Sequence, residues 1–235
     1  MSEGPGRIQL AAACRLAARL GWQEAVANHL SLAVSQDGRR FLMNRRWRDF
    51  STIRASDLAL LDASEADLPA GIDSTAWAIH GTLHRLLPQA RCVMHVHPTY
   101  ATALSALEDP RLLPIDQVSA RFFNRIAIDD AYGGFADSQA EGERLAAALG
   151  SRKILLMRNH GLMVTGSGAA EVFDLLYHFE RAARTLLLAY GSARPLRVLG
   201  DEVAEKTARS WEDDQDFPEA HFSQMCAGLD PCYRD

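Results

Sequence analysis

The segment Arg91-Cys92-Val93-Met94-His95-Val96-His97-Pro98 combines a run of apolar residues with two histidines two positions apart. A short apolar run of this kind is typical of a buried β-strand. Side chains alternate between the two faces of a strand, so His95 and His97 should point the same way and could bind one ion. Pro98 should end the strand, because proline lacks the backbone N–H that a strand ladder needs. The pair is therefore expected at a sheet edge, where a ligand can enter.

A second apolar run, residues 154–157, leads into Asn159-His160-Gly161, where we expect a glycine turn. Two strands that end in imidazoles supply three nitrogen ligands, the number that a catalytic zinc site uses while one position stays open. The alternative is that these histidines cap strands and bond to the backbone, which is the usual role of a single strand-end histidine. We predict that His95, His97 and His160 bind one divalent metal ion.

The composition is that of an ordinary globular protein. With 235 residues, 48% of them hydrophobic, the chain can bury a large core as one domain. The net charge of -5 and the lack of a basic run argue against nucleic acid as a partner. Four cysteines without a C-x-x-C pair, and no recognisable signal peptide, favour reduced thiols in the cytoplasm. No apolar run approaches the roughly 18 residues that a membrane-spanning helix needs.

Hydrophobic periodicity predicts strands and helices in alternation, with some strands joined by tight hairpins. Ser56-Asp57-Leu58 is expected to begin a helix that continues through residues 60–62. The other expected helices are 8–20, 73–87, 99–107, 138–149 and 169–190, and the expected strands are 30–34, 40–44, 92–97, 125–128, 154–157 and 161–166. Hairpins between strands indicate a mixed sheet rather than a purely parallel one, and hence a helix–sheet–helix sandwich of the α/β class.

The chain becomes acidic and polar beyond Pro195, with Trp211, Phe217 and Phe222 far apart in it. Such dispersed aromatic residues predict a poor core. We expect one domain over residues 1–198 and a C-terminal arm over 199–235 that contacts a neighbouring subunit.

Four motifs in order, Asn28-x-x-Ser31, His95-x-His97-Pro98, Asn159-His160-Gly161 and the long 169–190 helix, resemble the class II aldolase/adducin family. The resemblance covers about Ile8 to Tyr190. It implies a three-layer α/β/α sandwich around a largely antiparallel sheet, and a homo-oligomer, usually a cyclic tetramer, with active sites between subunits. It also implies a divalent ion, commonly zinc, held by histidines that correspond to His95, His97 and His160; manganese or iron is the alternative.

The sequence departs from the family's sugar-phosphate aldolases at three places. Their Ser-Ser-Glu-Trp segment corresponds here to Ser74-Thr75-Ala76-Trp77, followed by His80, so the catalytic glutamate is replaced by an alanine that cannot move a proton. Their Ser-Gly or Thr-Gly after the second strand corresponds to Arg45-Arg46-Trp47, and the glycine before Asn28 is Ala27. A tryptophan would fill the space in which backbone N–H groups cradle a phosphate. These differences argue against a sugar-phosphate aldolase.

Decarboxylation needs no proton to leave carbon or oxygen first, and a three-histidine metal can absorb the negative charge that develops on oxygen. Arg45, Arg46 and Arg48 could hold carboxylates in bidentate pairs, or could lie in a solvated surface loop. Trp47 could stack on a substrate ring or belong to the core.

We expect His29 to be the acid that protonates the carbanion, with Tyr132 as the alternative, and His80 to support the site from behind. The remaining substrate-binding candidates are Asn28, Ser31, Ser74 and Thr75.

The leading hypothesis is a metal-dependent carbon–carbon lyase, most simply a decarboxylase, acting on a small carboxylated and possibly aromatic substrate. One alternative is a retro-aldol lyase for an unphosphorylated hydroxy-keto acid, with His29 or Tyr132 as the base. Another is a non-haem iron oxygenase, since three facial nitrogen ligands also suit Fe(II). A third is an adducin-like protein-interaction module without catalysis, which the retention of all three histidines disfavours.

Overall fold

A seven-stranded mixed sheet forms the centre of the computed structural model, which describes residues 3–235. The strands are β1 (His29–Ala33), β2 (Arg40–Met43), β3 (Ala59–Asp62), β4 (Cys92–Val96), β5 (Ile126–Asp129), β6 (Ile154–Met157) and β7 (Gly161–Gly166). Their order is β3-β2-β1-β4-β7-β6-β5, and every neighbouring pair is antiparallel except β5 and β6. The expected mixed, largely antiparallel sheet is confirmed.

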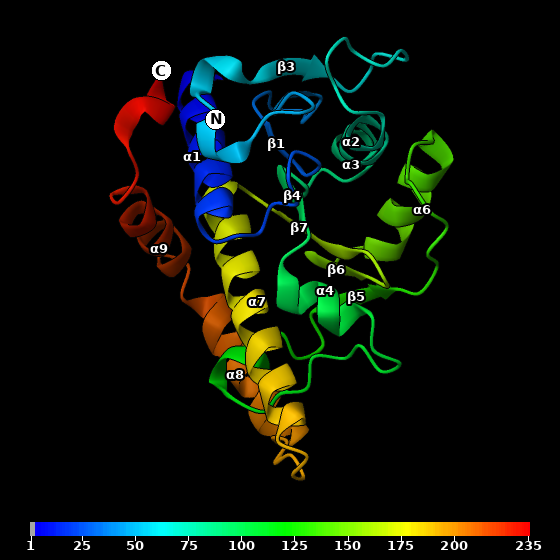
Figure 1. The fold of residues 1–235 in the computed structure, drawn as a ribbon, viewed down its shortest axis with the longest axis vertical. Coiled ribbons are helices and arrows are strands. Elements are labelled where there is room, and N and C mark those ends of the chain that lie inside the picture. Colours follow the sequence, from blue (N-terminus) through cyan, green and yellow to red (C-terminus); the bar gives the residue numbers. More distant parts are fainter. Residues whose placement is uncertain (1–2) are drawn as a thin grey trace.

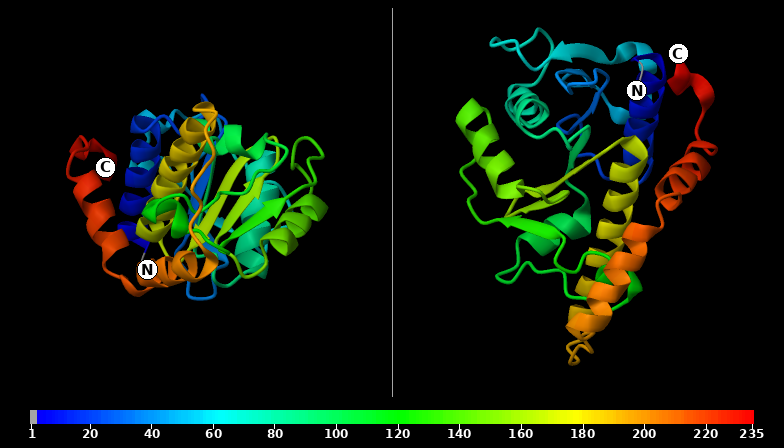
Figure 2. Two further views of the ribbon diagram at one scale, coloured as in Figure 1. Left: turned by 90° about the horizontal axis from the view of Figure 1, so that it is seen from below. Right: turned by 180° about the vertical axis from the view of Figure 1, so that it is seen from behind.

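Helices cover both faces of this sheet, so the three-layer α/β/α prediction is confirmed as well (Figures 1 and 2). One face carries α1 (Glu3–Arg19) and α7 (Ala169–Gly191), which pack on β1, β2, β4 and β7. The other carries α6 (Gln139–Leu149) and a broken helix made of α2 (Ser74–Ala76), the π-helical turn η3 (Trp77–Gly81) and α3 (Thr82–Leu86). Within residues 3–235 no helix combines the length and apolarity required to cross a bilayer.

The pleat of β4 divides its residues between the two faces. Cys92, Met94 and Val96 are buried in the hydrophobic cluster under α1 and α7. Val93 belongs instead to the cluster formed with α3 and α6 on the opposite face. His95 follows the same alternation as Val93, so its imidazole lies on the α3 and α6 side of the sheet.

The helix expected from Ser56 is wrong. The structure has a short 3₁₀ helix, η2 (Ala55–Asp57), followed directly by the edge strand β3. Asp57 accepts a hydrogen bond from the backbone N–H of Arg54, and Leu58 is already extended. Residues Ala59–Asp62 pair with β2 and alternate in burial. These tertiary contacts outweigh the helix-start signal, because helix propensity is weak and tertiary context often overrides it.

The C-terminal segment is more ordered and more buried than its composition indicates. It forms α8 (Asp201–Asp213), α9 (Phe217–Cys226) and η4 (Pro231–Arg234), which lie beside α7 and α1 of the same chain (Figures 1 and 2). Phe222 and Tyr233 are 4% and 2% exposed within the main hydrophobic cluster. The segment thus adds a few buried side chains to the core of its own chain, while most of its residues are exposed. The predicted contact with a neighbouring subunit stays a prediction.

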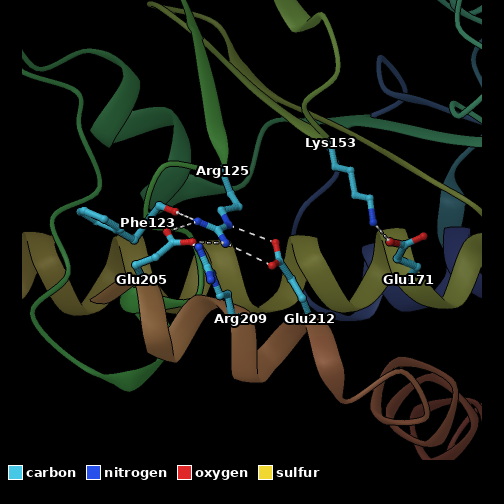
Figure 3. Close-up of polar contacts among 7 residues, drawn as sticks. All are labelled: Phe123, Arg125, Lys153, Glu171, Glu205, Arg209 and Glu212. Atoms are coloured by element: carbon cyan, nitrogen blue, oxygen red, sulfur yellow. Dashed lines mark hydrogen bonds and ion pairs between the residues drawn. The ribbon is translucent and has the colours of Figure 1, made fainter. Parts of the chain in front are cut away.

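Ion pairs attach α8 to the body of the protein (Figure 3). Arg125, next to the start of β5, donates to Glu205 and Glu212, with Nη2 to Glu205 Oε1 and Nε to Glu212 Oε1 both at 3.0 Å. A separate ion pair, not part of α8, joins Lys153 to Glu171 near the start of α7. Pairs exposed to this degree contribute about 1 kcal/mol or less each, so they set the position of α8 more than its stability.

Asp174 is the buried charge that joins three helices. Its Oδ2 accepts from Arg121 Nη2 at 2.6 Å, just after α5 (Gln117–Ala120), and its Oδ1 accepts from His221 Nδ1 of α9 at 2.6 Å. Asp174, His178 and His221 are close enough to hold a metal. However, His178 Nδ1 faces the Asp174 backbone carbonyl at 2.9 Å, and a guanidinium already neutralises the carboxylate. These contacts describe a buried, hydrogen-bonded ion pair, in which Arg121 Nη1 alone has no partner within residues 3–235.

Asp174 should give the protein a measurable loss of stability in acid. Burial alone would raise the pKa of Asp174, but hydrogen bonds from His178 and His221 and the Arg121 charge lower it to about 2. Because this pKa lies below the unfolded value, the contribution of about 2 kcal/mol is present above about pH 4 and lost as the pH falls toward 2. Urea unfolding of metal-free protein should show this pH dependence in the wild type and not in Asp174→Asn.

At neutral pH, Asp174→Asn should lower the free energy of unfolding by about 3–5 kcal/mol, because it leaves a buried guanidinium unpaired. Asp109→Asn, at an exposed pair with Arg111, is the matched control and should change it by less than about 1 kcal/mol. An Asp174→Asn protein as stable as the control would contradict the assignment.

Candidate metal centre

Three imidazoles from two segments of the chain converge at one end of the sheet. His95 lies near the end of β4, His97 follows that strand, and His160 lies in the turn between β6 and β7. Their ring centroids are 4.8 to 4.9 Å apart in all three pairs. The Nε2 atoms of His95 and His97 are 3.2 Å apart, and one nitrogen from each ring lies within 4.8 Å of the others. The structure brings together the three histidines named from the sequence, and their binding of a metal stays a prediction.

The rings of His95 and His97 are oriented from behind by acceptors. His95 Nδ1 lies 3.2 Å from the carbonyl oxygen of Leu162, and His97 Nδ1 contacts the carboxylate of Glu24. Acceptors at Nδ1 favour the tautomer whose Nε2 lone pair is free, as in most histidine metal sites. Asn28 Oδ1 in turn accepts from the backbone N–H of Glu24 at 2.5 Å and so holds this loop in place.

Glu24 was not predicted from the sequence. It lies in an irregular loop that has no periodicity, and only the fold brings it to His97.

The surroundings of His95 and His160 keep these two rings neutral. Burial, together with the neighbouring imidazoles, lowers the pKa of His95 well below its ordinary value. Burial and His97 lower the pKa of His160 to about 4. A neutral imidazole is the form that binds a metal. Three imidazole nitrogen donors, two of them on rings held by acceptors at Nδ1, therefore fit a borderline divalent ion such as zinc or Fe(II).

Gly161 serves a different purpose from the expected glycine turn. The left-handed residue of the turn is Asn159, with φ 55°, whereas Gly161 is the first residue of β7 and pairs with Met157. A Cβ on Gly161 would lie 2.5 Å from His97 Cδ2 and 3.0 Å from the carbonyl oxygen of Val96. Only glycine leaves room for the His97 ring.

His29 lies beside the three histidines. It pairs with His95 across β1 and β4, and the two ring centroids are 5.0 Å apart. Its Nδ1 lies 2.8 Å from His80 Nε2, which leaves Nε2 for a ligand. Burial, the main cause, lowers the pKa of His29 to about 4, so the ring is neutral at neutral pH. His80 lies behind His29, where a supporting residue was expected.

Ser31 requires a correction. It has no exposed surface, and its hydroxyl contacts His80 Nδ1 at 2.6 Å and His84 Nε2 at 2.8 Å. A side chain enclosed in this way cannot touch a substrate, so Ser31 lies beneath the site rather than in it. His84 was not predicted either, although its spacing of four residues from His80 on a helix is a usable signal.

The arginine-rich loop that follows β2 is exposed. Arg45 and Arg46 are in solvent, and Trp47 is 69% exposed, which excludes the core alternative for that residue. The guanidinium of Arg46 lies 4.2 Å from the centre of the Trp47 ring. Trp47 also has φ 59°, a left-handed conformation that costs a non-glycine residue on the order of 1 kcal/mol and is concentrated at functional sites.

The other candidates lie around the same end of the sheet. The Tyr132 ring is 59% exposed and 6.1 Å from that of His160. Ser74 is exposed, and Thr75 donates its hydroxyl to Asp73 at 2.5 Å. Ala76 is buried and offers no reactive group. The structure therefore leaves the substrate roles of Asn28, Arg45, Arg46, Trp47, Ser74 and Thr75, and that of Tyr132, as predictions.

The fold and the histidine centre define a class of α/β protein with a three-imidazole site at one end of a largely antiparallel sheet. The chain belongs to the class II aldolase/adducin family, since the Class II Aldolase and Adducin N-terminal domain matches residues 8–187.

Two relatives are informative. The chain is 31% identical to the protein named decarboxylase NovR of Streptomyces niveus, over 93% of this chain and 84% of that one. It is also 31% identical to 4-hydroxy-3-prenylphenylpyruvate oxygenase/4-hydroxy-3-prenylbenzoate synthase of Streptomyces roseochromogenus subsp. oscitans, over 93% of this chain and 82% of that one. Among solved structures, an aldolase II superfamily protein from Pseudomonas syringae superposes with a TM-score of 0.89 at 31% identity, covering 100% of this chain and 96% of that one.

Gly161→Ala should weaken metal binding by about 10- to 100-fold, because the new methyl displaces the His97 ring. Titration of the metal-free protein with zinc against a chromophoric chelator measures this affinity. Gly191→Ala is the control, since a Cβ there would meet no atom within 4 Å. Equal affinities for the two variants would show that the contact between Gly161 and His97 does not position a ligand.

Proposed function

We propose that the protein is a metal-dependent carbon–carbon lyase, most simply a decarboxylase, that acts on a small carboxylated substrate. The observation that carries the proposal is the convergence of His95, His97 and His160 without a carboxylate at position 76. A divalent ion held by these three histidines would act as a Lewis acid toward a substrate oxygen. Zinc is the first candidate, with manganese and iron as alternatives. The family's small-molecule chemistry supports an enzyme rather than an interaction module.

The residues of the chain would supply the other parts of the reaction. Arg45 and Arg46, in solvent beside this end of the sheet, would pair with a substrate carboxylate, and the Trp47 ring would stack on a planar substrate. As the bond to the carboxylate breaks, carbon dioxide leaves and its bonding electrons remain on the substrate. The carbon then takes one proton, which we assign to Nε2–H of His29, with water restoring it afterwards.

His29 differs from the acid expected from the sequence in one respect. Because its pKa is lowered to about 4, it would donate from the neutral ring rather than from an imidazolium. A neutral imidazole is a weak acid, so its donation must be supported at Nδ1, where His80 contacts it. Tyr132 remains the alternative donor, since its exposed ring lies 6.1 Å from that of His160.

The relative named as a decarboxylase supports this proposal, and the relative named as an oxygenase supports a second candidate, an iron-dependent oxygenase with the same three ligands. We also propose a homo-oligomer, most simply a tetramer, because the aldolase branch of the family assembles in this way. Sedimentation of a monomer at micromolar concentration would contradict the assembly.

Metal analysis and an anaerobic assay separate the candidates. Protein loaded with zinc, manganese or iron should be incubated with a panel of aromatic and aliphatic hydroxy acids and 2-oxo acids. We expect carbon dioxide without oxygen uptake, and loss of the product in His95→Ala with the fold retained. Release of an aldehyde without carbon dioxide would establish retro-aldol cleavage instead. Product formed only with iron and oxygen would establish the oxygenase.

The arginine loop should act on substrate binding rather than on the chemical step. Arg45→Ala combined with Arg46→Ala should raise KM by about 10- to 100-fold with kcat little changed, since each charge-assisted hydrogen bond contributes about 1.5–3 kcal/mol. Arg194→Ala, another exposed arginine, is the matched control. An unchanged KM in the double variant would remove these arginines from the site and weaken the carboxylate assignment.

A further inference from the structure

A continuous chain of hydrogen bonds runs from the metal centre into the interior. His29 Nδ1 lies 2.8 Å from His80 Nε2, and His80 Nδ1 lies 2.6 Å from Ser31 Oγ. Ser31 Oγ lies 2.8 Å from His84 Nε2. The four side chains are between 0% and 3% exposed, so no bulk water competes for these contacts. The last nitrogen, His84 Nδ1, is sealed and has no hydrogen-bond partner.

We infer that His80, Ser31 and His84 are positioning residues that hold His29 in a single tautomer, with its Nε2–H directed to the metal centre. The inference rests on the proposed function for its chemical meaning, since it makes His29 a proton donor. It concerns residues that touch neither metal nor substrate.

The local structure brings these groups together. His29 and Ser31 lie on the same face of β1, one above the other. The π-helical turn η3 carries His80 at a point where the helix is wider than usual, and His84 follows four residues later on α3. The His84 ring stacks on Phe41 with centroids 4.4 Å apart, which fixes its plane. Single-turn π-helices inside α-helices are frequent at functional sites.

His84 Nδ1, at the inner end of the hydrogen-bond chain, decides in which direction the hydrogen bonds are donated. Each link contains one proton, so the whole chain is donated either toward His29 or away from it. If the hydrogen bonds are donated toward His29, His84 Nε2–H donates to Ser31 Oγ and the Ser31 hydroxyl donates to His80 Nδ1. His80 Nε2–H then donates to His29 Nδ1. His84 Nδ1 is then a bare acceptor, and His29 keeps its proton on Nε2.

Donation away from His29 would place a proton on His84 Nδ1, which forms no hydrogen bond in the described part of the chain. The Ala90 carbonyl is near enough to raise the pKa of His84, but it does not meet the geometry of a hydrogen bond with Nδ1. Burial, the main cause, and the Arg91 charge lower that pKa to about 3, so the ring is neutral and carries one proton. Orphaned buried N–H groups are rarer than unsatisfied acceptors. The direction toward His29 is therefore favoured.

The hydrogen-bond chain also explains how a neutral imidazole, which is a weak acid, could donate a proton. When His29 passes its Nε2 proton to the substrate carbon, negative charge develops on the ring. The His80 N–H that already donates to Nδ1 then becomes a charge-assisted hydrogen bond, and such bonds are about twice as strong as neutral ones. One proton moves, from nitrogen to carbon, and water returns it. A lone buried histidine at this position would lack that support.

The test compares variants that are remote from the metal. In zinc-loaded protein with ¹⁵N-labelled histidine, long-range nitrogen–proton spectra report which nitrogen of His29 carries the proton, and His29→Gln assigns the signals. We expect only the Nε2–H form in the wild type. Ser31→Ala and His84→Phe break the chain and should give a mixture of both tautomers. His84→Gln restores an N–H at the Nε2 position and should restore the single form.

Kinetics on the substrate found by the carbon dioxide assay supply the second readout. Ser31→Ala and His84→Phe should lower kcat on the order of tenfold to a hundredfold with KM and zinc affinity within about twofold, and His84→Gln should recover most of kcat. Ser105→Ala, another fully buried serine, is the control and should leave the tautomer unchanged. Its hydroxyl bonds only to the backbone carbonyl of Thr102.

Two results would overturn the inference: a wild-type His29 that is mixed or protonated on Nδ1, or a tautomer that Ser31→Ala and His84→Phe leave untouched. The failure of the proposed function would look different. If the Nε2–H form is present and lost in both variants, yet no substrate releases carbon dioxide, the positioning chain stands and the decarboxylase proposal falls.

Discussion

The site depends on the pleat of a single strand. β4 lies between β1 and β7, and its register against both is fixed by residues that are buried on each face. A shift of one residue would turn His95 into the apolar layer under α1 and α7 and expose Met94 to the histidine centre. That exchange would bury an imidazole among hydrocarbon side chains. The hydrophobic pattern of β4 therefore fixes the strand register and, with it, the position of His95 in the histidine centre. His29 and Met163 pair with His95 from the two neighbouring strands, which transmits the same register to the surrounding residues.

The parts of the site that follow from periodicity were predictable from the sequence. Two histidines two apart on an apolar strand must share a face, and a third at the end of another strand needed only the correct sheet order to join them. Glu24 could not be found in this way, because its loop has no period and is held by Asn28 through one hydrogen bond. The sequence prediction put Ser31 on the correct face of β1, but it did not foresee that the side chain is fully buried. It lies about 7 Å along β1 from His29, far enough to be under α3 rather than at the opening.

The same distinction explains the fold. The mixed sheet and its helical layers follow from alternating patterns and hairpins, whereas β3 and the C-terminal helices depend on partners distant in the chain. Phe222 reaches Phe173, with ring centroids 5.5 Å apart, and nothing near Phe222 in the sequence indicates that contact. Arg125 likewise holds Glu205 and Glu212, which lie 80 and 87 residues away. Composition alone describes this segment as polar, while its few apolar side chains fill gaps between helices that are already in place.

The centre is therefore built in two parts with different physical demands. His29, His95 and the side chains behind them lie on strands and a packed helix, where burial removes competing water and fixes each ring. His97 and His160 lie just beyond strand ends and are partly exposed. The arginines, Trp47 and Tyr132 lie on exposed loops, where substitutions disturb little of the core. Residues on exposed loops can change without disturbing a buried framework, because few core contacts depend on them. One fold can therefore support different reactions, and two relatives that are each 31% identical to this chain are named for different reactions.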